Sequence, residues 1–199
     1  DVIRGWRDYV DDAPDELSTA CVIITAPPEE FVPESLKGRP AVGMAVLYVG
    51  DPDQGADAVG PLRALKPAVD LIQPMPYTAF QALLDPMAPR GYRSYWRGEY
   101  LSTLSNEAIN AFVRNAPALT AAAVPFSQMI LFRIGQGVTA VPDEATAFSH
   151  RDSAYLFHPI TMWADPADDE RLIRQPARSP MPCGPSEPAV HTSTSRQKP

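Results

Sequence analysis

The sequence predicts an α+β fold: a mainly antiparallel sheet with helices packed on one face. Four apolar stretches rich in β-branched residues have the length of strands, at 17–26, 41–49, 126–134 and 155–163. Segments with helical spacing alternate with them irregularly, unlike the regular repeat of a parallel βαβ fold. No Gly-rich turn leads from a strand into a helix, which argues against a dinucleotide-binding parallel sheet.

The elements of the first half follow from the spacing of apolar residues. Residues 1–12 are predicted to be an amphipathic helix, because Val2, Ile3, Trp6, Tyr9 and Val10 recur at helical intervals. The strands at 17–26 and 41–49 come next, and Pro27-Pro28 ends the first of them. A helix over 56–65 should be weakened or kinked at Gly60-Pro61, and 69–73 is predicted to be a short strand.

The second half is predicted in the same way. A short helix at 77–84 precedes an aromatic strand at 92–100. Ser105 can cap a helix that carries Ala108, Ile109, Phe112 and Val113 on one face. Pro159 has no N–H, so the strand at 155–163 is expected to lie at an edge or to contain a bulge. Acidic residues between 165 and 170 suit the start of a helix.

Composition limits the class of function. The chain has 199 residues, 45% of them hydrophobic, with a net charge of −7, which argues against a nucleic-acid partner. No run approaches the about 18 apolar residues that a membrane helix needs, so no membrane partner is expected. Cys21 and Cys183 are too few for a disulfide framework, and a cytoplasmic location fits them. Since Asp1 already begins a helical pattern, we expect the chain to be part of a longer protein.

The last 25 residues differ from the rest. Residues 175–199 are rich in proline, and Met181 and Val190 are their only sizeable apolar side chains. Such a segment cannot bury enough surface to offset the entropy lost on ordering, so we predict a disordered tail. Residues 1–174 are then the folded part.

Five segments, in order over residues 1–174, resemble FAD-linked oxidases of the berberine-bridge-enzyme type, particularly bacterial members. They are WRDYVDDAPDELST at 6–19, PMPYTAFQALLD at 74–85, GYRSYWRGEYLSTLS at 91–105, SQMILFRIGQ at 127–136 and TAFSHRDSAYLFHPITMWADPADDE at 146–170. The resemblance implies a partial substrate domain that covers the reactive face of a flavin, with the FAD-binding domain missing. It also implies FAD as cofactor of the intact protein, with none bound by this part alone.

The chain departs from that family at two places. Plant members have an acidic general base directly after the aromatic residue that corresponds to Tyr155, whereas Leu156 stands here. The family continues past residue 170 with a strand containing Asn and an aromatic residue, whereas this chain has its proline-rich tail. We hypothesise that the tail is a frameshift product. Codons can be chosen for residues 181–195 so that the shifted reading frame encodes a segment ending in Asn-Phe, the pair expected in the family's strand.

The resemblance places several residues at the wall of a substrate cavity. Tyr77 and Gln81 lie one helical turn apart; the alternative is a helix that only caps the sheet. Tyr95, Trp96 and Arg97 could line a pocket for a planar substrate, with Arg97 holding a carboxylate, or form an amphipathic strand. The segments that carry the resemblance add Gln128, His150, Arg151 and Tyr155 to this wall.

Two histidines are candidates for chemistry. His150 could accept a proton, while the adjacent Arg151 could equally pair with a carboxylate as a structural clasp. His158 shares its strand face with Leu156 and is the titratable group that could replace the missing base. The competing interpretation is a histidine satisfied within the core. Three widely spaced histidines do not predict a metal site.

The sequence therefore favours part of an FAD-dependent oxidoreductase that removes hydride from an alcohol or amine carbon and is inactive alone. The alternative is a stand-alone α+β module for small-molecule binding or oligomerisation.

Overall fold

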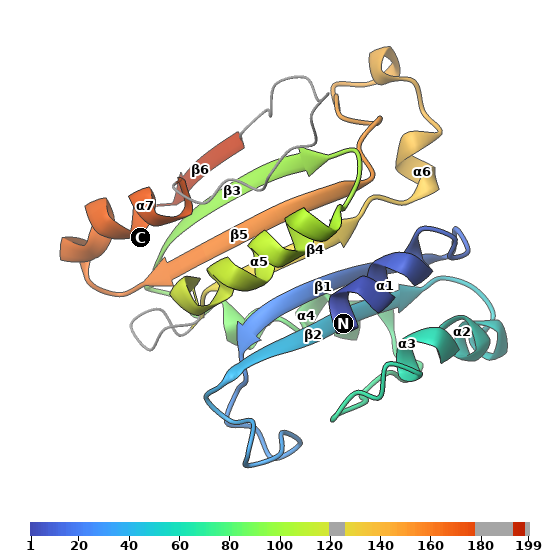
Figure 1. Cartoon of the computed structure of the whole chain (residues 1–199), viewed down its shortest axis with the longest axis horizontal. Coiled ribbons are helices and arrows are strands. Elements are labelled where there is room, and N and C mark those ends of the chain that lie inside the picture. The colour runs from blue at the N-terminus through green and yellow to red at the C-terminus, as the bar shows by residue number, and fades with distance from the viewer. Residues whose placement is uncertain (120–125, 178–192, 198–199) are drawn as a thin grey trace.

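The computed structural model describes residues 1–119, 126–177 and 193–197 and contains a six-stranded antiparallel sheet (Figure 1). The strand order is β2-β1-β4-β5-β3-β6. The strands are β1 (Leu17–Thr25), β2 (Pro40–Tyr48), β3 (Arg93–Leu101), β4 (Gln128–Arg133), β5 (Tyr155–Trp163) and β6 (Ser193–Gln197). Every pairing is antiparallel, which confirms the predicted sheet type.

The register divides the side chains of β1 to β5 between two faces. Cys21 lies opposite Leu131, Leu131 opposite Phe157, and Phe157 opposite Glu99, so these four share one face. Residues one position away point to the other side, because side chains alternate along a strand. We call this other side the open face. Its positions are Ser18, Ala20, Val22, Ile24, Ala41, Gly43, Ala45, Leu47, Ser94, Trp96, Gly98, Tyr100, Gln128, Ile130, Phe132, Leu156, His158, Ile160 and Met162.

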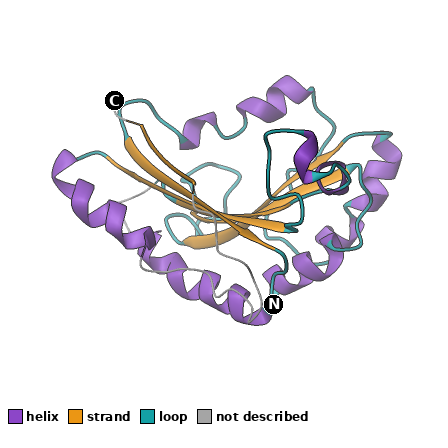
Figure 2. Cartoon of the chain, turned by 90° about the horizontal axis from the view of Figure 1, so that it is seen from above, coloured by secondary structure: helices purple, strands orange, loops and turns teal. Residues whose placement is uncertain are grey.

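The long helices lie on the side opposite the open face. The helices are α1 (Val2–Val10), α2 (Pro52–Ala58), α3 (Gly60–Arg63), α4 (Tyr77–Ala82), α5 (Asn106–Leu119), α6 (Gln136–Thr139) and α7 (Asp169–Ala177), with short 3-10 turns at 85–87, 143–145 and 166–168. Figure 2 shows helices along one whole side of the sheet, and mainly loops and short helices on the other. This confirms the predicted α+β arrangement.

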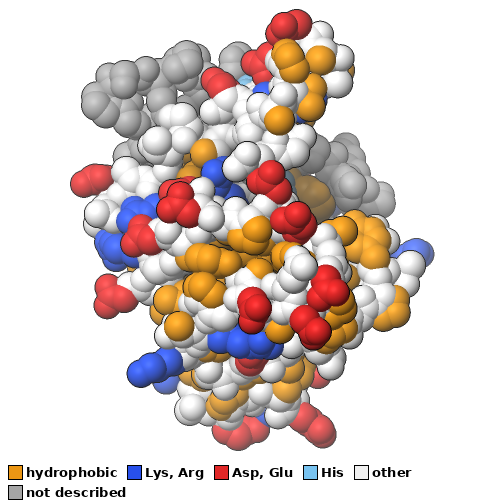
Figure 3. All heavy atoms as spheres, turned by 90° about the vertical axis from the view of Figure 1, so that its right-hand side faces the viewer, with side chains coloured by type: hydrophobic (Ala, Val, Ile, Leu, Met, Phe, Trp, Pro, Cys, Tyr) orange, Lys and Arg blue, Asp and Glu red, His pale blue; other side chains and the backbone are white. Residues whose placement is uncertain are grey.

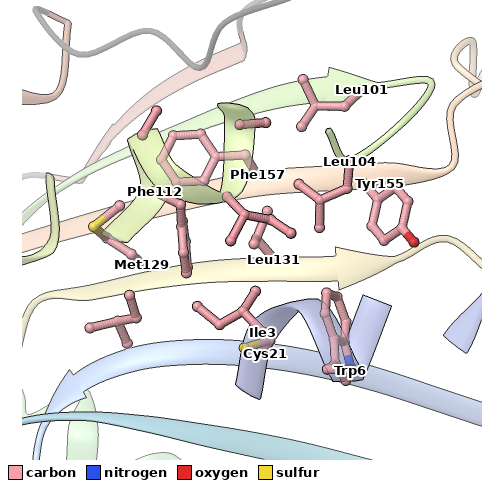
Figure 4. Close-up of a cluster of buried hydrophobic side chains, with 14 of the residues drawn as sticks. Ile3, Trp6, Cys21, Leu101, Leu104, Phe112, Met129, Leu131, Tyr155 and Phe157 are labelled. Carbon is pink, nitrogen blue, oxygen red and sulfur yellow. The ribbon is translucent and has the colours of Figure 1, made fainter. Parts of the chain in front are cut away.

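The main core fills the space between the sheet and helices α1 and α5 (Figure 4). Trp6 of α1 is fully buried, and its indole N–H donates to the Thr19 hydroxyl at 3.0 Å. Phe112 of α5 meets Phe157 edge-to-face, with ring centroids 5.8 Å apart. Because Leu131 and Cys21 lie beneath these rings with no exposed surface, this side of the sheet is closed.

The predicted helices and strands are found close to their expected bounds, with three corrections. Residues 69–73 are not a strand; the Ile72 N–H instead donates to the Asp70 carboxylate, and Leu71 is half exposed. Val113 points to solvent rather than to the core. Pro159 lies inside the sheet, between β4 and β3, and no bulge is present.

The sheet accommodates Pro159 through a local gap in one ladder. The β3–β5 pairing omits the two positions opposite His158 and Pro159 and resumes in the same register. The β4–β5 pairing is continuous through this point. A residue without an N–H can therefore occupy an interior strand, because the ladder gives up hydrogen bonds on only one side.

The tail predicted at 175–199 is only partly described. Helix α7 continues to Ala177, and residues 193–197 pair with β3 as β6. Residues 178–192 and 198–199 lie outside the described part of the chain. Residues 193–197 therefore form a strand where a disordered tail was predicted. For residues 178–192 and 198–199, disorder stays a prediction.

The open face is only half covered. Tyr92 and Phe126 pack over a small cluster of Ala20, Ile130, Ile160 and Met162. None of the residues of α4, which lies behind the sheet in Figure 1, is buried. Figure 3 shows apolar side chains gathered across the end of the molecule where α2 and α6 lie, interspersed with acidic ones.

Candidate functional site

Three rings from adjacent strands meet on the open face. Trp96 of β3 meets His158 of β5 edge-to-face, with ring centroids 5.6 Å apart and planes at 88°. Phe132 of β4 lies on the other side of His158, at 6.3 Å and 53°. Trp96 is 38% exposed and Phe132 36% exposed. We call Trp96, His158 and Phe132 the ring triad; it presents aromatic surface to solvent with one nitrogen base at its centre.

The environment of His158 favours the neutral form of its ring. Burial among apolar side chains lowers the pKa of His158 below its usual range. A hydrogen bond to the backbone of Arg97 partly opposes this, because it favours the protonated ring. A backbone hydrogen bond that raises the pKa of an imidazole is one in which the ring N–H donates to a carbonyl, here that of Arg97. The second nitrogen of the neutral ring is then an acceptor that a ligand hydroxyl could use.

A second aromatic cluster continues along β3. Tyr100 stacks on His150 at 4.1 Å and meets Phe148 at 6.1 Å. His150 has a backbone φ of 126°, outside the region that L residues normally adopt. Strain of this kind persists only where the surroundings hold a residue in place. The stack on Tyr100 therefore fixes His150 beside the open face.

Arg151 acts as a structural clasp in the loop that follows α6. Its guanidinium donates to the Val138 carbonyl at 2.8 Å and to the Thr146 hydroxyl at 2.6 Å. The Arg151 N–H donates to the Asp143 carboxylate at 3.1 Å. Of the two interpretations given for Arg151, the geometry favours the clasp, although its guanidinium is held by a backbone carbonyl and a hydroxyl rather than by a carboxylate.

Tyr155 does not line the open face, which corrects the prediction for this residue. It points toward the helices, is 1% exposed and meets Trp6 edge-to-face at 6.0 Å (Figure 4). Its hydroxyl donates to the Asp11 carboxylate, and burial raises its pKa. The Arg133 guanidinium lies over its ring at 5.3 Å. Tyr155 therefore joins α1 to the sheet.

Tyr95 and Arg97 also lie on the helix-covered side, which corrects their assignment to a pocket wall. Tyr95 packs against a small cluster of Trp163 and Leu172 near α7. Arg97 pairs with Glu99 at 2.8 Å, and Glu99 is 1% exposed. Since Arg97 is committed to a buried carboxylate of the protein, it is not placed to hold a substrate carboxylate at the ring triad.

The remaining candidates have mixed positions. Gln128 lies on the open face opposite Ile160 but is nearly buried. Tyr77 and Gln81 are exposed on α4, and Tyr77 stacks on Phe80 at 6.3 Å. The role predicted for Tyr77 and Gln81 stays a prediction.

Phe132 and Tyr100 were not among the residues predicted to line a site. Phe132 was part of a strand predicted as a whole, with no face assigned to its residues. The residues of β4 are buried from Gln128 to Leu131 without alternation, so no pattern within the strand assigns a face to Phe132. Only the pairing of β4 with β5 reveals that Phe132 and His158 point to the same side.

The turn from β2 into α2 has no glycine-rich phosphate cradle. Helix α2 follows β2 through Val49, Gly50 and the capping Asp51, a turn with a single glycine. A hollow between α1 and β4 has a volume of about 20 Å³, room for about one water. Across the residues that the structure describes, no group of three or more metal-ligating side chains is found. No helix among them is long and apolar enough to span a membrane.

The chain resembles FAD-linked oxidoreductases in sequence and fold. It is 27% identical over 150 residues to an FAD-linked oxidoreductase of Dictyostelium discoideum, covering 72% of this chain and 29% of that protein. It matches no protein-family model. The chain thus spans less than a third of the length of this relative.

Solved structures give the same fold. A BBE-like protein of Arabidopsis thaliana has a TM-score of 0.62 at 13% identity over 89% of this chain and 38% of its own. The 6-hydroxy-D-nicotine oxidase of Arthrobacter nicotinovorans has a TM-score of 0.65 at 17% identity, with the same coverage. A xylooligosaccharide oxidase of Myceliophthora thermophila has a TM-score of 0.64 at 16% identity, covering 89% and 40%. The fold is that of a region of berberine-bridge-type oxidases.

Proposed function

We propose that this chain is the substrate-side wall of an FAD-dependent oxidoreductase that removes hydride from an alcohol or amine carbon. The observation that carries the proposal is the open face. A sheet closed by helices on one side presents an aromatic triad around a neutral imidazole on the other. The fold, which covers about two fifths of several flavin oxidases, supports the same conclusion.

In this proposal, His158 is the proton acceptor. Removing hydride from an alcohol carbon leaves a carbonyl and requires the hydroxyl proton to go to a base. FAD would supply the two-electron acceptor for the hydride. Leu156, where plant members have an acidic base, cannot take the proton. His158 lies two residues further on the same face, and its free ring nitrogen can accept it.

We further propose that the chain alone is inactive, because FAD is held by a domain outside it. The match to 29% of an oxidoreductase and 38% of solved oxidases supports this. The exposed rings of Trp96 and Phe132 support it too, since aromatic side chains on a sheet face are normally covered.

A second candidate is a stand-alone α+β module for small-molecule binding or oligomerisation. The closed core between the sheet and α1 favours it, because Trp6, Leu131 and Phe112 are fully buried without help from another domain. Such a core can fold by itself.

Flavin retention tests the proposal. The chain is mixed with excess FAD, passed through gel filtration, and examined for visible flavin absorbance in the protein peak. We expect colourless protein with cooperative unfolding by circular dichroism. Stoichiometric flavin in the peak would contradict the view that another domain holds FAD. The second candidate would be favoured if the colourless protein binds a small molecule and an added flavin domain does not oxidise that molecule.

A further inference from the structure

The open face lacks formal charge. Of its positions on β1 to β5, none is Asp, Glu, Lys or Arg. The charged residues of these strands, Arg93, Arg97, Glu99 and Arg133, all lie on the helix-covered side by the same register. An exposed sheet face normally carries alternating polar and charged side chains. This face has the composition of a surface that is covered in use.

Its solvent-accessible part is aromatic rather than polar. Trp96 and Phe132 each keep more than a third of their surface exposed, on either side of the half-buried His158. The polar side chains Ser94 and Gln128 are nearly buried and so offer little to a ligand. At the triad, the imidazole of His158 offers a hydrogen-bond acceptor between the two exposed rings.

Each ligand class makes different demands on such a surface. A carboxylate needs a cation, and Arg97, the nearest in sequence to Trp96, is paired with Glu99 on the opposite side. An ammonium can lie over an aromatic ring, but a neutralising carboxylate is found at none of the open-face positions on β1 to β5. A sugar needs several hydrogen-bond partners, and losing its hydration without them is costly. An aromatic ring with one hydroxyl needs a stacking surface and a single acceptor.

We propose that the substrate is a neutral planar aromatic alcohol, which stacks on Trp96 and Phe132 and donates its hydroxyl hydrogen bond to His158. This inference rests on the proposed function, because it takes the open face to be the substrate-side wall. It names the substrate class, which the solved structures do not decide, since they include a 6-hydroxy-D-nicotine oxidase and a xylooligosaccharide oxidase.

The test is a two-dimensional NMR titration of the whole chain with four probes: benzyl alcohol, cyclohexylmethanol, benzoate and cellobiose. We expect saturable shifts of the Trp96 indole N–H and the His158 ring with benzyl alcohol. We expect the other three probes to bind at least roughly tenfold more weakly, a difference of about 1.4 kcal/mol. Tighter binding of benzoate or cellobiose, or no saturable shift with benzyl alcohol, would overturn the proposal.

Matched variants locate the site. Phe132→Leu should weaken benzyl alcohol binding, whereas Phe31→Leu, at a 51% exposed ring in the loop between β1 and β2, should leave it unchanged. Equal effects of the two would place the ligand elsewhere. In a further titration with toluene, His158→Phe should remove most of the preference for benzyl alcohol over toluene, because it removes the acceptor.

The outcome is separable from that of the proposed function. Flavin retained by the chain alone would contradict the missing FAD domain while leaving aromatic alcohol selectivity intact. Colourless protein that prefers cellobiose would be consistent with an FAD domain outside this chain and would refute the aromatic alcohol as substrate class.

Discussion

Two neighbouring residues of β4 should differ sharply in their contribution to stability. Leu131 has no exposed surface and lies between Cys21 and Phe157 beneath α5. Phe132 is 36% exposed on the open face. Leu131→Ala leaves a cavity that its neighbours cannot fill, so it should lower the free energy of unfolding by about 3–4 kcal/mol.

Phe132→Ala should cost less although it removes a larger side chain. Full burial of a Phe side chain contributes about 1.5–3 kcal/mol, and only about two thirds of this ring is buried. No enclosed cavity results, because the position opens to solvent, so the expected loss is about 1 kcal/mol. The gap of at least about 2 kcal/mol should appear in urea unfolding and as a difference in Tm of about 4–8 °C.

Urea unfolding of both variants, followed by circular dichroism, measures this gap. Unchanged m-values would show that the denatured states are comparable. If Phe132→Ala costs as much as Leu131→Ala, the open face is packed as tightly as the helix-covered one. That result would contradict the proposal that the open face is covered by another domain in the intact protein.

Two further predictions concern local chemistry. Burial raises the pKa of the Cys21 thiol to about 12, so at pH 8 roughly one molecule in ten thousand carries the thiolate. In a Cys183→Ser variant, Cys21 should therefore not react with a disulfide reagent until the protein unfolds. Rapid labelling of the native protein would contradict the burial of Cys21. The Ser105 hydroxyl accepts the Ala108 N–H at 3.1 Å and caps α5. Ser105→Ala should therefore lower stability by about 1 kcal/mol in thermal unfolding, whereas Ser105→Asp should retain most of it, and equal losses in both would refute capping.

Local patterns were sufficient for most elements. The Ser105 cap and the helical spacing of Ile3, Trp6 and Val10 involve residues close in sequence, so the sequence alone predicts them. Residues 69–73 show the limit of this reasoning. An apolar run becomes a strand only where a neighbouring strand can pair with it, and the run at 69–73 has none in the part of the chain described.

The face of each strand was the main unpredictable property. Tyr155 and His158 differ by three positions, so alternation places them on opposite faces and both cannot line one cavity. The same holds for Trp96 and its neighbours Tyr95 and Arg97. Alternation separates the two sets, but only the packing of α1 and α5 determines which set is buried. Predicting the site therefore needed the position of the helices as well as the strands.

Pro159 was misjudged for a related reason. An edge position was expected because a proline removes one ladder hydrogen bond. The sheet instead leaves two positions of the β3–β5 ladder unpaired and keeps its register. One of these positions is His158, whose ring is hydrogen-bonded to the backbone of Arg97 on β3. The irregularity that proline introduces thus lies beside the candidate base, which explains how a side chain can reach backbone of the neighbouring strand there.

Titration of His158 provides a test that links stability to binding. Because its pKa in the folded chain is below the usual 6.5, the folded state disfavours protonation. Its contribution to stability is present above pH 6.5 and is lost as the pH falls through the lowered pKa. A ligand hydroxyl that donates to the neutral ring must lower this pKa further, because it binds only the neutral form and excludes water. Benzyl alcohol should therefore depress the His158 pKa in NMR titrations and bind more weakly as the pH falls. Tighter binding in acid would mean that His158 donates to the ligand, and it could not then be the proton acceptor.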